Sequence, residues 1–169
     1  MVTAVNASVT SVPAFTSINS FDVVEGEVLN HALTATDAAN DTLTFSLKAG
    51  SPAWLSVSGS TMSGTVPDPS SDTEVFTATV IVDDSFGNTV EQEISITVVD
   101  AEINVISTAA GSANTITSAQ LNAVDGVTGA VAGNEVYYQA AIEAGSASDF
   151  DTAAEIQAMV TAVNASVAS

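Results

Sequence analysis

Apolar and polar residues alternate with a period of two at three places in the first hundred residues. The three runs cover residues 42–47, 76–82 and 90–98. Such alternation is typical of half-buried antiparallel strands. Four further apolar segments end in turn residues and raise the predicted number of strands to seven: Phe21–Val24, Val28–Ala35, Trp54–Val57 and Thr61–Val66. Seven short strands in about 90 residues predict a β-sandwich.

From about residue 114 the pattern changes to one typical of helices. The sequences Thr117–Gln120 and Thr152–Glu155 fit capping boxes, and Asn134 is the expected N-cap of a helix over Glu135–Ala144. The last helix has the clearest apolar stripe, with spacing i, i+3, i+4, i+7 at Ile156, Met159, Val160 and Val163. These segments predict a small three-helix bundle, so that the chain combines an all-β part with an all-α part.

One segment of nine residues occurs twice. Met1–Val9 is identical to Met159–Val167, at an offset of 158 residues. Nine consecutive identities favour a tandem repeat over chance similarity between two alanine- and valine-rich segments. We therefore expect residues 1–9 to overlap with the end of a previous repeat as a helix stub, residues 10–103 to form the sandwich, and residues 104–169 to form a helical spacer that runs into the next repeat.

The charge of the chain is very unbalanced. Twenty acidic residues face a single lysine, Lys48, no arginine and one histidine, which gives a net charge of -19. This excludes binding to nucleic acid and to anionic membrane surfaces, and no apolar run is long enough for membrane insertion. Carboxylates in such number suit hard cations, above all calcium.

Four segments of the first part resemble the motifs of dystroglycan-type cadherin-like domains. The segment 36–45 resembles their D-x-D-x-D-x-L-x-Y sequence, 52–57 their P-x-W-L-x-F sequence, 63–67 their S-G-T-P turn and 82–87 their A-x-D-x-x-G loop. The resemblance covers roughly residues 13–100. It implies an immunoglobulin-like, cadherin-like sandwich of the kind that recurs in large tandem-repeat bacterial surface proteins and adhesins.

The resemblance also implies calcium ligands. Carried over by position, these are Asp37, Asp41 and Asp84, while Glu25 and Asp100 are weaker candidates. Ala39 replaces the middle acid of the family's run and removes one expected ligand. The alternative is that these acids are ordinary turn residues that bind their own backbone.

The helical part is similar to short helical spacer modules of large bacterial adhesins, in which segments like Ala119–Asn122 and Ala154–Met159 recur. Together the two resemblances imply a structural repeat unit of a long extracellular protein or filament at the bacterial cell surface. Its partners would be adjacent copies of the same repeat, in a covalent array or a non-covalent filament, and a glycan or cell-surface receptor could be bound elsewhere in the full protein.

No catalytic motif accompanies these features. His31 has no cysteine or serine motif beside it, and the chain lacks a G-x-S-x-G elbow, a P-loop, a dinucleotide fingerprint and an H-E-x-x-H sequence. We therefore predict that the chain is not an enzyme. The alternative function is that of a carbohydrate-binding module in an extracellular protein, which requires a planar row of exposed aromatic side chains; only 5% of the residues are aromatic.

Overall fold

The computed structural model describes residues 11–168, so the expected helix stub Met1–Val9 lies outside the described residues. The described chain forms two compact units. The first unit contains residues 11–68 and 74–98, and the second contains residues 69–73 and 99–168. Each unit has a hydrophobic core of its own.

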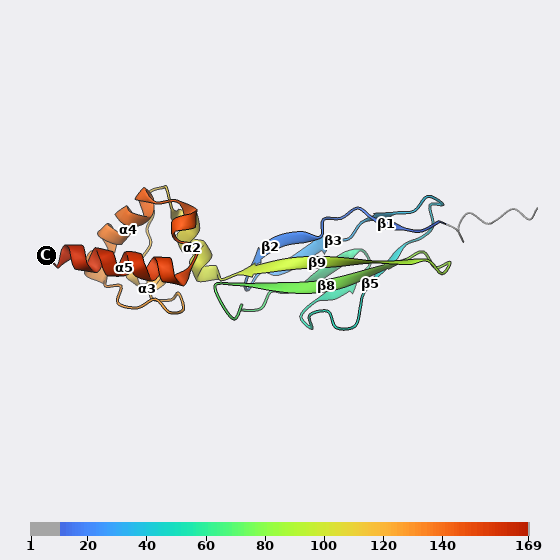
Figure 1. Ribbon diagram of the computed structural model, residues 1–169, viewed down its shortest axis with the longest axis horizontal. Helices are drawn as coiled ribbons and strands as arrows, with labels where there is room; N and C mark the ends of the chain where they lie inside the picture. The colour runs from blue at the N-terminus through green and yellow to red at the C-terminus, as the bar shows by residue number, and fades with distance from the viewer. Residues whose placement is uncertain (1–10, 169) are drawn as a thin grey trace, which may run out of the picture. The chain divides into compact units, whose positions relative to one another are not determined.

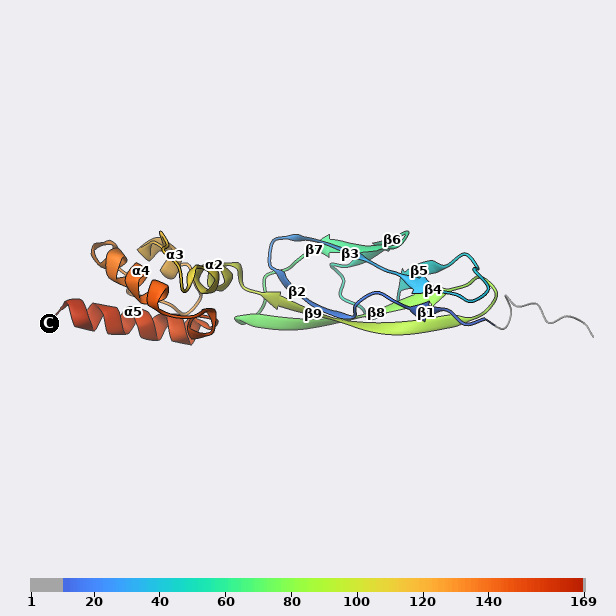
Figure 2. The ribbon, with the colours of Figure 1, turned by 90° about the horizontal axis from the view of Figure 1, so that it is seen from above.

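The first unit is a β-sandwich, and its two main sheets form separate layers in Figure 2. One sheet has the strand order β2-β9-β8-β5 and the other has the order β3-β7-β6, while β1 pairs with β4. The strands are β1 Ala14–Phe15, β2 Ser20–Val24, β3 Val28–Ala32, β4 Ala35–Thr36, β5 Thr44–Leu47, β6 Ser56–Ser58, β7 Thr61–Thr65, β8 Thr73–Asp83 and β9 Thr89–Val99.

The alternation along the sequence places the core of the sandwich. On β8 and β9 every second side chain is more buried than its neighbours, and Val80, Val82, Ile94 and Ile96 are completely buried. The neighbouring residues on the opposite face of each strand are more exposed. The predicted strand faces are therefore confirmed.

Residues 11–168 form nine strands rather than the expected seven. Each of the seven expected strands has a counterpart, and the two additional ones are β1 and β4. Both contain only two residues, which is too short to produce a recognisable alternation. They nevertheless matter for the site, because β4 leads directly into Asp37.

Gly64 on β7 passes very close to Trp54. A Cβ atom at this position would collide with the Trp54 carbonyl oxygen and would lie 2.9 Å from Cε3 of its ring. Trp54 in turn meets Phe76 edge to face, with ring centroids 5.7 Å apart. Trp54 is partly buried and packs against the buried cluster of the sandwich.

The second unit is helical, and it contains four α-helices rather than the three that the sequence predicts. These are α2 Ala101–Ala109, α3 Ser118–Leu121, α4 Glu135–Ala144 and α5 Ala153–Val167, with short 3₁₀ helices η1 Ala132–Asn134 and η2 Ala147–Asp149 (Figure 1). The helix that sequence analysis missed is α2. Its β-branched residues Ile103, Val105 and Ile106 favour a strand by propensity, but Ile103 and Ile106 face the helical core.

Local capping fixes where these helices begin. Thr117 forms the predicted capping box with Gln120 at the start of α3, and the Thr152 hydroxyl accepts a hydrogen bond from Glu155 N at the start of α5. Tyr138, Ile142, Ile156 and Val160 are completely buried among these helices. No helix among residues 11–168 is long and apolar enough to cross a membrane.

Candidate metal centre

Asp37 follows β4 and begins the loop that leads to β5. Its Oδ1 atom accepts hydrogen bonds from the backbone N–H of Ala39 at 2.8 Å and of Asp41 at 3.5 Å. Its Oδ2 atom is buried and has no hydrogen-bond partner among the described residues. One oxygen of Asp37 therefore shapes the loop, as expected of a turn residue, while the other is left for a ligand.

Asp84 follows β8 and begins the turn to β9. It is the one charged residue among residues 11–168 that is buried, with no exposed side-chain surface. Its Oδ1 accepts from the backbone N–H groups of Phe86 at 2.8 Å and Asn88 at 3.0 Å, and its Oδ2 accepts from Asn88 Nδ2 at 2.6 Å. Burial raises the pKa of Asp84, but these hydrogen bonds together outweigh burial and lower it below its usual value. Asp84 is therefore held as a carboxylate.

Strand pairing brings the two loops together. β5 pairs with β8 in the register Thr44↔Asp83, so the loop before β5 and the turn after β8 lie at the same end of the sandwich. There one carboxylate oxygen from each of Asp37, Asp41 and Asp84 lies within 4.8 Å of the others. Below, these three residues are called the acidic triad.

Both loops of the acidic triad contain a strained residue. Asn40 has a φ of 58° and Ser85 has a φ of 64°, and these are the two non-glycine residues with positive φ among residues 11–168. A left-handed backbone costs free energy for residues with a side chain and persists where the surroundings impose it. The loops thus hold the three carboxylates close at a cost to the fold.

Ser11 connects the start of the described chain to the same end of the sandwich. Its carbonyl oxygen accepts from Asn88 Nδ2 at 2.8 Å, and its hydroxyl accepts from Ala38 N at 3.1 Å. Sequence reasoning did not include Ser11, since no motif distinguishes it from the other serines of the chain. Asn88 was recognisable as a polar turn residue close to Asp84.

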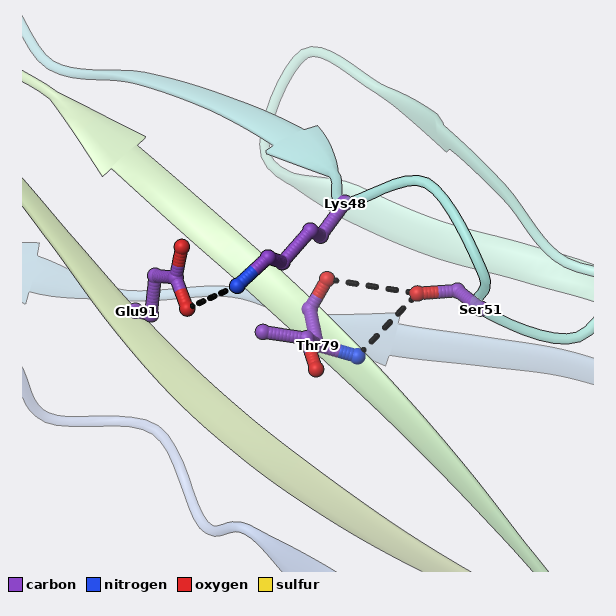
Figure 3. A network of polar contacts seen from close by, with 4 residues as sticks. All are labelled: Lys48, Ser51, Thr79 and Glu91. Carbon is purple, nitrogen blue, oxygen red and sulfur yellow. Dashed lines mark hydrogen bonds and ion pairs between the residues drawn. The ribbon is translucent and has the colours of Figure 1, made fainter.

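No basic side chain compensates the acidic triad. The single lysine, Lys48, follows β5 and pairs with Glu91 on β9 at 2.7 Å (Figure 3). In the same network the Ser51 hydroxyl accepts from Thr79 N at 3.1 Å. The chain has no arginine, and its single lysine is engaged with Glu91.

The donor set fits calcium. Calcium takes about 6–8 oxygen ligands from carboxylates, carbonyl groups and water. The buried Asp37 Oδ2 gains a positive partner in such a site, and no nitrogen or sulfur donor lies in the acidic triad. Asp37, Asp41 and Asp84 would hold the ion, and water or backbone carbonyl groups would complete its coordination.

The other two residues that the resemblance implied as ligands do not join the acidic triad. Glu25 lies in the turn between β2 and β3, at the opposite end of the sandwich from the β8–β9 turn (Figure 1). Asp100 is the N-cap of α2, and its Oδ1 accepts from Ile103 N at 2.9 Å. A capping carboxylate satisfies an unpaired N–H of the first helical turn, which explains Asp100 without a metal.

Comparison with known families agrees with this fold. Residues 10–99 match the model of a family described as "Putative Ig domain". The chain belongs to this family. Ig domains of this architecture occur in many cell-surface proteins and are typical of extracellular adhesion-type repeats rather than of enzymes. The match covers the sandwich and not the helical unit.

Solved structures similar to the Ig domain include cadherin repeats. Human protocadherin-24 EC1-2 is 23% identical, with a TM-score of 0.45, over 53% of this chain and 44% of that chain. Protocadherin gamma B7 domains 1–4 are 17% identical, with a TM-score of 0.45, over 56% of this chain and 25% of that chain. The GspB Siglec domain is 19% identical, with a TM-score of 0.38, over 53% and 58% of the two chains. The chain thus spans less than two thirds of each of these structures, and no curated protein sequence matches it.

Proposed function

We propose that this chain is a structural repeat unit of a long extracellular bacterial surface protein or filament, and that calcium stabilises its Ig domain. The observation that carries the calcium part is the acidic triad, in which carboxylate oxygens of Asp37, Asp41 and Asp84 lie within 4.8 Å of one another. Asp84 is fully buried, and Asp37 and Asp41 are half-buried. The dystroglycan-type character of the domain and the spacer role of the helical unit are parts of the same proposal.

Electrostatics supports a bound cation. Clustered carboxylates repel one another, and the repulsion is strongest where water is excluded. Protonation could relieve it, but the hydrogen bonds to Asp84 keep the pKa of that carboxyl low. Lys48 is engaged with Glu91, so a cation from solution would balance the negative charge of the acidic triad.

The tandem repeat supports the structural role. The segment Met159–Val167, which is identical to Met1–Val9, forms the C-terminal part of α5, where Val160 and Val163 are buried in the helical core. In an array with a period of 158 residues, α5 of one copy would lead directly into the Ig domain of the next. A bacterial cell-surface location is part of the same proposal, and the excess of acidic residues supports it because like charges would keep neighbouring fibres apart.

A carbohydrate-binding module is less well supported. Sugar binding needs several exposed aromatic rings in one plane. Among residues 11–168 the aromatic side chains that are strongly exposed are Phe86 in the β8–β9 turn and Tyr137 on α4, which belong to different units. No row of rings arises from them.

Unfolding of the full chain in calcium and in a chelator tests the proposal. A ligand that binds only the folded state adds RT ln(1 + [L]/Kd), about 2.7 kcal/mol at a hundredfold excess over Kd. We expect the unfolding midpoint in urea to fall when EDTA replaces calcium, and magnesium to have a weaker effect because it prefers a smaller, stricter geometry. An unchanged midpoint would rule calcium out.

Two variants and a control localise the effect. Asp37→Asn and Asp84→Asn each keep the shape of the side chain and remove one charge, so each should shrink the difference between calcium and EDTA. Asp22→Asn removes an exposed charge on β2 and should leave the difference intact. If the difference between the midpoints in calcium and in EDTA shrank equally in all three variants, this would indicate a general charge effect and contradict the assignment of the site.

A further inference from the structure

The nine-residue identity fixes how closely two copies approach each other, provided that the chain is the repeat unit proposed above. With an offset of 158 residues, Val167 corresponds to Val9, and Ser169 falls at the position of Ser11, where both copies carry serine. Only two peptide steps therefore separate the last residue of α5 from the Ser11 position of the next copy. Two residues span at most about 7 Å.

Ser11 is a fixed point of the Ig domain and not part of a free linker. Hydrogen bonds donated by Asn88 Nδ2 and by Ala38 N attach it to the end of the sandwich that carries the acidic triad. The C-terminal end of α5 of one copy must therefore lie directly against this end of the next Ig domain. A connection of this length leaves no room for a flexible spacer.

The end of the helical unit that meets the Ig domain is built around Asn164. Its Oδ1 accepts hydrogen bonds from Tyr138 Oη at 2.5 Å and from Asn134 Nδ2 at 2.8 Å, and its Nδ2 donates to the Gly129 carbonyl at 2.9 Å. These bonds join the last turns of α5 to the beginning of α4 and to the loop before it. Each of these three segments carries an exposed valine: 40% of Val167, 65% of Val136 and 48% of Val131 are accessible to solvent.

The facing end of the Ig domain is also partly apolar. Phe86 in the β8–β9 turn is 49% exposed, and Val12, next to Ser11, is 58% exposed. Both ends of a repeat thus carry large exposed apolar side chains, which lose contact with water if the ends meet. At the joint between two copies, the apolar side chains of one end lie close to those of the other.

We infer that successive copies form a head-to-tail contact, in which Val131, Val136 and Val167 of one copy pack against Val12 and Phe86 of the next. The occupant of each apolar end is thus a second copy of this chain. Such a contact is heterologous, because the two surfaces differ, and it extends into an open fibre rather than closing into a ring of two.

A small contact is sufficient in this position. Interfaces between domains of one chain are about 600–1,500 Å² and need not be stable between separate molecules, because the covalent link supplies a high effective concentration. The carboxylates facing this end are those of the acidic triad, and Glu135 in the first turn of α4 is engaged by the backbone N–H and hydroxyl of Ser118. Calcium bound to the acidic triad would lower the repulsion at the joint.

A tandem protein tests this contact. It joins Val167 of one full copy to Thr10 of a second, which keeps the period of 158 residues. Because the chain has no cysteine, spin labels can be attached at two chosen positions only. These are introduced by Ala162→Cys in the first copy and Thr77→Cys in the second. Both are exposed and lie on α5 and β8. Double electron–electron resonance then measures the distribution of distances between the helical unit of one copy and the Ig domain of the next.

We expect one narrow distance peak, which is lost when Phe86→Ser is placed in the second copy or Val136→Ser in the first. Val75→Ser is the matched control, because Val75 is 60% exposed at the beginning of β8, away from the joint, and should leave the peak unchanged. A broad distribution in the parent protein, or the same result in all three variants, would overturn the contact. Circular dichroism of each variant checks that both units remain folded.

The same measurement in calcium and in EDTA separates this contact from the proposed calcium site. A narrow peak in both solutions supports the contact even if unfolding of the single chain shows no effect of calcium. A peak that is narrow in calcium but broad in EDTA supports the contact and connects it to the acidic triad. Broad distributions in both solutions overturn the contact, even if calcium stabilises the single Ig domain.

Discussion

Asp37 and Asp84 place carboxylate oxygens within 4.8 Å of each other, although one residue follows β4 and the other follows β8. Asp84 is completely buried and charged, and Asp37 keeps a buried oxygen without a hydrogen-bond partner. A fold that only needed turns at these positions would not need to bring two carboxylates together. This pair is the part of the molecule on which the calcium proposal depends.

The low pKa of Asp84 predicts a loss of stability in acid. A carboxyl whose pKa is lower in the folded chain than in the unfolded chain stabilises the fold at pH above its unfolded value, about 3.9, and this stability is lost as the pH falls through the folded pKa. Urea unfolding in EDTA, measured from pH 6 downward, should show this loss. The part of this loss that Asp84 causes should be absent in Asp84→Asn. A pH profile of stability identical to that of the parent would contradict the role given to Asp84.

Asp151 predicts an effect of opposite sign in the helical unit. A hydrogen bond with Glu155, desolvation and the negative charges of Glu155 and Asp149 raise the pKa of Asp151. Because this pKa is raised, the contribution of Asp151 to stability is largest at pH below the pKa of the unfolded chain. It is lost as the pH rises through the pKa of the folded chain. Asp151→Asn should therefore slightly stabilise the chain at pH 7, with a gain that shrinks toward pH 4. Asp125→Asn, at another exposed acid, provides the control for net charge.

Gly64 should not tolerate a side chain. The Cβ atom of Gly64→Ala would overlap the Trp54 carbonyl and force β7 away from it, which we expect to cost at least about 2 kcal/mol, as overpacking of a core does. Gly133→Ala is the matched control, because no atom lies within 4 Å of a Cβ there and the change should stay within about 0.5 kcal/mol. Similar urea midpoints for the two variants would contradict the close approach.

Asn164→Ala should weaken the helical unit. It leaves the buried Tyr138 hydroxyl and the Asn134 amide without their common acceptor, which we expect to cost about 1–3 kcal/mol in the free energy of unfolding. Asn30→Ala on β3 removes one exposed hydrogen bond to Val28 O and should have little effect. Because Tyr138→Phe removes the same hydroxyl, its effect and that of Asn164→Ala should be less than additive in a double-mutant cycle.

The sandwich could be predicted from the sequence because its strongest signal is periodic. The side chains of β8 and β9 alternate over eleven residues each, and the buried set follows that pattern. α2 could not be recognised in the same way, since Ile103, Val105 and Ile106 have strand propensity and only their tertiary packing makes the segment helical. Asp100 as a helix N-cap, with Glu102 in the first turn, was the signal that could have found it.

The candidate site was only partly accessible from the sequence. Motif resemblance selected Asp37, Asp41 and Asp84, which the pairing of β5 with β8 brings together. It also selected Glu25 and Asp100, because sequence position alone does not tell which end of a sandwich a loop occupies. The attachment of Ser11 to Asn88 depends on tertiary structure and has no local pattern.

A crystal structure of the full chain grown in calcium, with anomalous scattering recorded, tests the central claim most directly. The account predicts an anomalous peak at the acidic triad, with oxygen atoms of Asp37, Asp41 and Asp84 about 2.3–2.6 Å from the ion. A triad that holds only water at a calcium concentration of several millimolar, with its carboxylates turned apart, would contradict it.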